Sequence, residues 1–278
     1  MNRPHLRLGS AVFALVSLAA SAAGAADLPT TKAPPAPAPY VPPAFSWTGF
    51  YIGGNVGGAW GDGSLKTETS VAGVPMFTNI IPNNFHNAAT SVIGGGQAGY
   101  NWQFGQGGFG QFGQGVFGIE TDIDWTGIDR AASVTLAGPG PFTTTTFART
   151  EVNWIGTTRG RLGYAFGYEN RVLVFGTGGV AYGGVQNNGS VTINGVTDAW
   201  SGSNSPTLVG WTAGGGIEYA ITNNITIRGE YLFYDLGSQK TVFAPNGAAA
   251  ADFPGTTFTA KANYDGSIAR GAINWKFF

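Results

Sequence analysis

Apolar and polar residues alternate along the chain with a period of two, which is the period of side chains on the two faces of a β-strand. The stretch 50–60 reads FYIGGNVGGAW and places on one face Phe50, Ile52, Val56 and Trp60. The opposite face carries Tyr51, Gly53, Asn55, Gly57 and Ala59. Similar alternation recurs in seven further stretches, at 91–104, 116–125, 151–164, 171–183, 208–220, 225–234 and 267–278. The pattern predicts eight amphipathic strands.

The composition indicates that the bulky face of these strands contacts lipid. Aromatic residues make up 13 % of the chain and charged residues only 10 %, whereas a soluble domain carries about 25 % charged residues. Beyond the N-terminus the sequence has no apolar run of the length, about 20 residues, that a membrane helix needs. The sequence therefore predicts an all-β fold, an eight-stranded antiparallel up-and-down transmembrane β-barrel. Such a barrel must close, because lipid cannot satisfy the backbone groups of an open strand edge.

The segments between the predicted strands alternate between long and short. The long ones are approximately 61–90, 126–150, 184–206 and 237–266, and the shorter ones are approximately 105–115, 165–170 and 221–224. Bacterial outer-membrane barrels have long extracellular loops and short periplasmic turns. We therefore expect four long extracellular loops, three short periplasmic turns and both termini in the periplasm.

The N-terminal part of the chain differs in composition from the rest. A basic start, a short apolar core and small residues suited to cleavage after Ala25 or Ala26 indicate an export signal peptide at 1–25. Residues 26–46 are rich in proline, which predicts a semi-rigid periplasmic tether. The barrel is then expected to occupy 47–278.

Seven stretches combine strand alternation with recurrent glycines: FSWTGFYIGGNVGGAW, GGGQAGYNWQ, VFGIETDID, NWIGTTRGRLGYAF, GTGGVAYG, GWTAGGGIEYA and ITIRGEYLFYDLG. Together they resemble the small outer-membrane immunogenic proteins of alphaproteobacteria, which are porin-family barrels related to the transmembrane barrel of OmpA. The resemblance extends over about 45–278. It implies an eight-stranded barrel with structural, surface-antigen and envelope-integrity roles, and haemin binding is attributed to some members of the family.

Charged residues on the predicted inward faces are balanced in number. The acids are Glu120, Asp122, Asp124, Glu218 and Glu230, and the bases are Arg159, Arg161, Arg228, Arg270 and Lys276. Unpaired charges inside a low-dielectric wall are costly, whereas paired and hydrogen-bonded charges persist. An eight-stranded barrel has room inside only for its own side chains. We therefore expect an ion-pair network that fills the lumen.

The last residues of the chain form the expected assembly signal. Trp275 and Phe277 continue the outward phase of Ile273, and Phe278 follows as an extra residue. Barrels of the family that the chain resembles usually end with a single phenylalanine in the outward phase. We expect the barrel-assembly machinery to recognise this strand and outer-membrane lipid to surround the barrel. Contacts on the peptidoglycan side or with a host surface remain open.

Motifs that could indicate catalysis or cofactor binding have simpler interpretations. GGGQAG at 94–99 matches a dinucleotide-binding fingerprint, but strand alternation follows it instead of the required helix. Asp122 and Asp124 share one face near arginines, which favours ion pairing over metal binding. His86 stands alone in the first long loop, and the formal net charge of −1 does not favour nucleic acid.

We therefore expect a non-enzymatic outer-membrane barrel of porin-family type. It should have no catalytic residue, no cofactor, no metal site and no nucleic-acid partner. Two alternatives remain open. The loops could bind a ligand or host molecule such as haemin, or the barrel could be a narrow diffusion pore.

Overall fold

The computed structural model describes residues 45–70, 84–105, 114–137, 141, 143–193, 196–252, 255 and 257–277. The predicted signal peptide, nearly all of the predicted tether and Phe278 lie outside the described residues. Within the described part of the chain, no helix has the length and apolar character needed to cross a bilayer.

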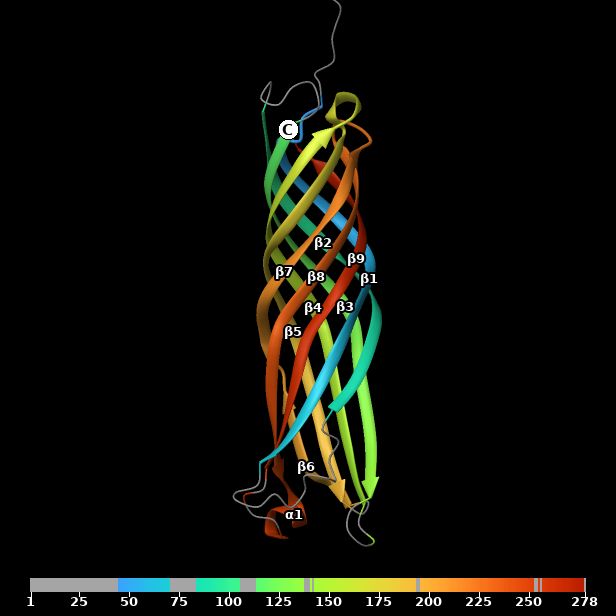
Figure 1. Cartoon of the computed structure of the whole chain (residues 1–278), viewed down its shortest axis with the longest axis vertical. Helices are drawn as coiled ribbons and strands as arrows, with labels where there is room; N and C mark the ends of the chain where they lie inside the picture. Colours follow the sequence, from blue (N-terminus) through green and yellow to red (C-terminus); the bar gives the residue numbers. More distant parts are fainter. Residues whose placement is uncertain are drawn as a thin grey trace, which may run out of the picture. The chain divides into compact units, whose positions relative to one another are not determined.

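Antiparallel strands form a closed ring (Figure 1). The strands among the described residues are β1 (Gly49–Ser70), β2 (Asn84–Phe104), β3 (Gln114–Ala137), β4 (Thr143–Phe166), β5 (Val172–Ile193), β6 (Val196–Asn204), β7 (Thr207–Ala220), β8 (Ile225–Pro245) and β9 (Thr257–Lys276). The helical segments are a short 3₁₀ helix, η2 (Tyr168–Asn170), and α1 (Gly247–Asp252).

The ring has eight strand positions. β1 pairs with β9 and so closes it, while β6 and β7 share one position between β5 and β8. The predicted eight-stranded up-and-down barrel is confirmed.

The strands continue into segments that were predicted as loops. β3 and β4 stay paired from Phe117 with Leu162 to Ala137 with Thr143, so most of the predicted loop 126–150 is a strand hairpin. Threonine and other β-branched residues are frequent in this hairpin, and they favour an extended backbone. The barrel end at which Ala137 pairs with Thr143 is called the hairpin end below. The opposite end, which carries the short turns 167–171 and 221–224, is the turn end.

Side chains alternate between the outside and the inside of the barrel. Ile119 and Val180 point outward and expose 49 % and 48 % of their surface, whereas Glu120 and Arg159 are buried. The predicted alternation is confirmed along the ring. Exposed apolar residues include Trp60, Val92, Trp125, Leu162, Trp211 and Trp275.

Glycine on the inward face makes room for side chains on neighbouring strands. A Cβ atom at Gly57 would lie 2.6 Å from Cα of Arg270 on β9, and one at Gly216 would lie 2.9 Å from Cζ of Phe175 on β5. Both separations are too short for a real contact. On the inward face of 50–60, a larger residue would therefore not fit at Gly57, whereas Tyr51 of the same face is buried in the lumen.

The interior of the barrel is divided into layers. Near the turn end lies an apolar plug of Phe45, Trp47, Val116, Ala165, Leu173, Phe175 and Ala220. Toward the hairpin end lies an upper apolar cluster of Ala59, Ile93, Ile128, Val152, Ile155, Ala181, Val185, Leu208, Leu232, Tyr234, Leu236, Ala262, Tyr264 and Ile268. Along β3 the charged side chains lie between Val116 of the plug and Ile128 of the cluster. Charged residues thus occupy the middle of the lumen.

The chain immediately before β1 forms part of the plug. Trp47 donates from its backbone nitrogen to Oε1 of Gln103 at 2.6 Å and from Nε1 to the carbonyl of Asn170 at 2.8 Å. The ring of Phe45 packs edge-on against Trp47, with 4.9 Å between centroids. Phe45 therefore belongs structurally to the barrel mouth, although the sequence pattern placed it in the tether.

Candidate functional site

Strand register brings nine charged residues together in the middle of the lumen. We call this set the charged layer: Glu120, Asp122, Asp124, Arg159, Arg161, Glu218, Arg228, Glu230 and Arg270. Glu120 lies opposite Arg159 on the adjacent strand, Glu218 opposite Arg228, and Glu230 opposite Arg270. Residues opposite each other on paired strands point to the same face, so each of these three acids meets a base inside the barrel.

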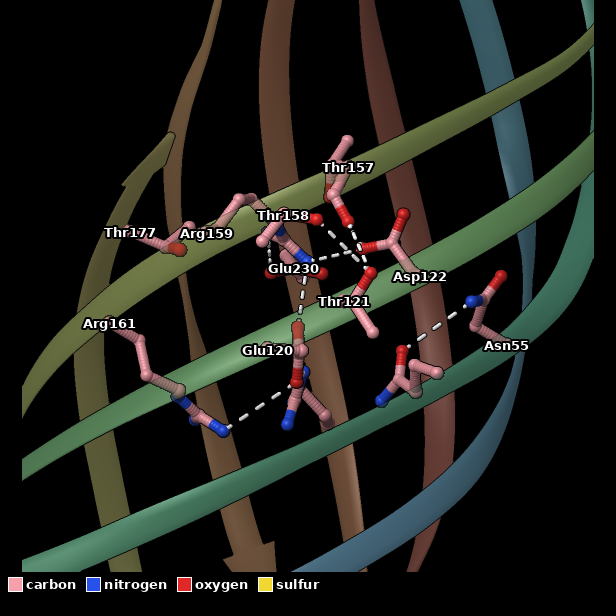
Figure 2. Close-up of polar contacts among 12 residues, drawn as sticks. Asn55, Glu120, Thr121, Asp122, Thr157, Thr158, Arg159, Arg161, Thr177 and Glu230 are labelled. Atoms are coloured by element: carbon pink, nitrogen blue, oxygen red, sulfur yellow. Dashed lines mark hydrogen bonds and ion pairs between the residues drawn. The ribbon is translucent and has the colours of Figure 1, made fainter. Parts of the chain in front are cut away.

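Arg159 connects two sides of the lumen (Figure 2). Its Nη2 lies 2.7 Å from Oε1 of Glu120 and 2.7 Å from Oδ2 of Asp122, both on the neighbouring strand β3. Its Nη1 lies 2.6 Å from Oε1 of Glu230 on β8. The Arg159 side chain is 0 % exposed. One guanidinium therefore neutralises carboxylates that reach it from opposite parts of the ring.

Arg270 on β9 makes a second junction of the same kind. Its Nη2 lies 2.8 Å from Oδ2 of Asp122 and 2.9 Å from Oε2 of Glu230, and its Nη1 pairs with Asp124. Asp122 and Glu230 are thus shared by Arg159 and Arg270. Sharing makes this half of the charged layer one connected network rather than a set of separate pairs.

Arg161 and Arg228 form the part of the charged layer nearest the apolar plug. Both contact Oε2 of Glu218, Arg161 from Nη2 at 2.8 Å and Arg228 from Nε at 3.1 Å. Arg228 also donates from Nη1 to Glu120 at 2.5 Å. The Arg161 guanidinium lies 4.1 Å from the ring centroid of Phe175, where the ring face attracts a cation.

Several neutral residues complete the layer, and sequence reasoning assigned no role to them. Tyr51 donates to Glu120, Thr226 donates to Glu218 at 2.6 Å, and Asn274 donates to Glu218 at 3.0 Å. The sequence did signal Tyr51, because it is the single aromatic residue on the inward face of 50–60.

Lys276 lies apart from the charged layer, in contrast to its predicted place in the lumen network. Its ammonium donates to the carbonyl of Ser46 and lies 5.0 Å from the ring centroid of Phe45 at the turn end. Lys276 is close to the end of β9, so its side chain reaches the mouth of the barrel. The charged layer consequently holds five carboxylates and four guanidiniums instead of five of each.

The chemistry of the charged layer favours mutual neutralisation. Each of its five carboxylates forms an ion pair with at least one arginine. Among the described residues, no group of three or more His, Asp or Glu side chains is placed to hold a metal ion. His86 lies within β2, and its side chain is not among those described.

Aromatic side chains form two belts on the outside of the barrel. Toward the hairpin end the ring pairs are Trp60–Tyr231, Trp154–Tyr182 and Trp211–Phe233. Toward the turn end they are Phe50–Phe277, Trp102–Phe117 and Tyr164–Phe166. An apolar band between aromatic girdles on a closed antiparallel ring defines a transmembrane β-barrel.

The family follows from comparison with known proteins. Residues 11–265 match the model of the outer membrane protein beta-barrel domain, and the chain belongs to this family of the bacterial outer membrane. The chain is 34 % identical over 265 residues to a 31 kDa outer-membrane immunogenic protein of Brucella melitensis, covering 95 % of this chain and 97 % of that protein.

Two further similarities extend the comparison. A 22 kDa outer membrane protein of Rhizobium leguminosarum is 33 % identical over 72 % of this chain and 69 % of its own length. The crystal structure of OprG from Pseudomonas aeruginosa aligns with a TM-score of 0.42 at 12 % identity, covering 84 % of this chain and 98 % of OprG.

The lengths of the connections give an expectation for the orientation of the barrel. In bacterial outer-membrane barrels the short turns face the periplasm and the long connections face outward. We therefore expect the turn end to face the periplasm and the hairpin end to face the cell exterior. The outward apolar residues between the aromatic belts contact outer-membrane lipid.

Proposed function

We propose that the protein is a closed, non-enzymatic barrel with a structural and surface-presenting role in the outer membrane. The observation that carries this proposal is the fully buried Arg159, which pairs with Glu120 and Asp122 on one side of the lumen and Glu230 on the other. A solute passing through the barrel would have to separate these pairs, and breaking a buried pair costs about 3–5 kcal/mol.

The remaining layers support a closed lumen. Trp47 and Phe45 fill the periplasmic mouth, and the upper apolar cluster fills the lumen beyond the charged layer. An eight-stranded barrel is only wide enough for its own side chains. A narrow diffusion pore is therefore disfavoured, because three layers in series would have to open together.

The exterior role is supported by the length of the hairpins. β3 and β4 continue as a pair beyond the outer aromatic belt up to Ala137 and Thr143, so they hold a rigid surface above the membrane. Relatives of the chain are named outer-membrane immunogenic proteins. We infer that this exposed hairpin makes the protein a surface antigen.

Conductance across a planar bilayer tests the closed lumen. The purified barrel should show at most small and rare openings, and a mock preparation from cells without the gene controls for other porins. The double variant Arg159→Ala/Glu230→Ala removes one acid and one base together, and it should open more often because the brace across the lumen is gone. Stable channels of large conductance in the unmodified protein would refute the proposal.

A further inference from the structure

Arg130 on β3 is a buried cation that lies outside the charged layer. It is only 8 % exposed, yet the ion pairs among the described residues do not include it. Its Nε atom has no hydrogen-bond partner. A guanidinium removed from water without a partner costs several kcal/mol. The Nε donor of Arg130 is therefore available to an anion.

The charged layer cannot supply this anion. Asp124 is the layer's nearest acid along β3, and Arg130 lies six positions further along the strand, which corresponds to roughly 20 Å. Ile128, which is buried in the upper apolar cluster, lies between them. The excess carboxylate of the charged layer is thus on the far side of an apolar barrier.

Polar donors accompany Arg130 at the same level of the lumen. Strand register places Arg130 opposite Thr150, and Thr150 opposite Asn187 on β5. Oδ1 of Asn187 accepts from Thr150 Oγ1 at 3.0 Å and from Tyr264 Oη at 2.6 Å. This fixes the amide with its Nδ2 donor unpartnered, although Asn187 is only 7 % exposed.

Two glycines leave room around the guanidinium. A Cβ atom at Gly61 would collide with Nη2 of Arg130, and one at Gly266 would lie 2.6 Å from the hydroxyl of Tyr234. The pair of glycines on β1 and β9 thus accommodates the Arg130 head group and the Tyr234 phenol side by side. Unlike the arginines of the charged layer, Arg130 is not in any of the ion pairs between described side chains.

We propose that Arg130, together with the amide of Asn187, binds a small oxyanion of the carboxylate or phosphate type. The planar guanidinium presents paired N–H donors that match two oxygens of such a group. Arg130 lies beyond the outer aromatic belt, because it is five residues past Trp125 toward the hairpin end. The ligand therefore enters from the cell exterior and stops in the outer part of the upper apolar cluster, to which Tyr234 and Tyr264 belong. The site does not depend on whether the charged layer conducts.

Anion binding can be measured on the purified full-length mature barrel in detergent. Inorganic phosphate is titrated into Tris–chloride buffer at constant ionic strength, and the midpoint of thermal unfolding is followed by the heat-modifiable gel shift. Isothermal calorimetry gives the affinity. The unmodified protein should show a saturable rise of the midpoint. Arg130→Gln should weaken phosphate binding at least about tenfold, because one charged bidentate contact is lost.

Arg149→Gln is the matched control, because Arg149 lies on the outer surface near the same end and pairs with Asp129. This variant should bind phosphate like the unmodified protein. An equal response in Arg130→Gln, or a rise that does not saturate in any variant, would overturn the proposal.

A second variant covers the case in which Arg130→Gln does not fold. Asn187→Asp introduces a carboxylate at the level of Arg130, so it should raise the unfolding midpoint without phosphate and abolish the phosphate response. If Asn187→Asp lowers the midpoint and keeps the response, Arg130 is not the anion receptor.

Discussion

Arg159 on β4 donates from Nη1 to Oε1 of Glu230 on β8 at 2.6 Å. These strands are not paired with each other, and β5 and β7 separate them around the ring. The contact therefore crosses the lumen and fixes the distance between two distant parts of the wall. Backbone pairing alone fixes only the spacing of adjacent strands.

Removing this brace should destabilise the barrel strongly. Arg159→Met leaves Glu120, Asp122 and Glu230 without one of their bases, and we expect a loss of about 3–5 kcal/mol in the free energy of unfolding. Urea titration of the barrel in lipid vesicles measures the loss. Arg149→Met is the control, because Arg149 and Asp129 are both substantially exposed, and exposed pairs contribute little. Comparable losses in the two variants would contradict the buried network.

A charge on the lipid-facing surface should be costly near the middle of the membrane. We expect Ile119→Arg and Val180→Arg each to cost about 2–4 kcal/mol, because both side chains point into the apolar band. Thr144 lies in a segment predicted as a loop, but in the structure it belongs to β4 and is buried, so it is not a suitable control. Ser203 is exposed on β6 beyond the outer belt, so Ser203→Arg should be nearly neutral. Equal costs at all three sites would refute the assigned faces.

The apolar plug should stabilise the fold, but the lumen should stay closed without it because the charged layer also blocks the lumen. Trp47→Ala removes a fully buried indole and its hydrogen bond to Asn170, and we expect a loss of about 3–5 kcal/mol in the free energy of unfolding. Conductance should nevertheless stay low, because the charged layer still fills the lumen. Large stable channels in Trp47→Ala would mean that the plug, and not the ion pairs, is the barrier.

The C-terminal strand should be required for assembly. Phe277 packs against Phe50 with 5.7 Å between ring centroids, and its backbone nitrogen donates to the Phe50 carbonyl at 2.8 Å. Deleting Phe277 and Phe278 should leave protein unassembled in the periplasm, which fractionation and the heat-modifiable gel shift would detect. The single change Phe278→Ala should be tolerated better, since Phe277 carries the outward phase. Normal barrel formation after the deletion would exclude this part of the assembly signal.

Acid should weaken the surface pair at the hairpin end. Arg149 donates from Nε and Nη2 to the two oxygens of Asp129 at 3.0 and 2.7 Å, and these hydrogen bonds lower the pKa of Asp129. A lowered folded-state pKa stabilises the fold above the ordinary aspartate pKa, and the contribution disappears as the pH falls through the folded value. In Arg149→Gln the pKa should return toward about 3.9, as measured by carboxyl NMR. An unchanged titration would show that the pair does not form in solution.

The sequence contained enough information to predict the barrel because lipid and a narrow lumen make opposite demands on the two faces. Ile119 and Glu120 are neighbours in sequence, and only a strand with one face in lipid explains both. Beyond the outer belt this contrast fades, so the continuation of β3 and β4 resembled a loop. Arg130 lies in this continuation, where the sequence pattern does not indicate which side chains face inward.

Pairing partners inside the lumen were partly predictable. Glu120 with Arg159 and Glu230 with Arg270 follow from adjacent strands, whereas Arg159 with Glu230 requires knowledge of side-chain reach across the ring. Lys276 is the exception among the predicted lumen bases. The alternation predicted that its side chain faces inward. Because Lys276 is the last residue of β9, however, the side chain lies at the mouth of the barrel and contacts Ser46 and Phe45.

The position of Arg270 on the last strand has a consequence for the order of assembly. Before β9 joins β1 and β8, the other strands bring together five carboxylates and only three guanidiniums, with Asp124 lacking its base. Docking of β9 supplies the fourth guanidinium and closes the ring in the same event. An unfinished barrel therefore carries two surplus negative charges in its lumen, and docking of the last strand lowers that surplus to one and gives Asp124 its base.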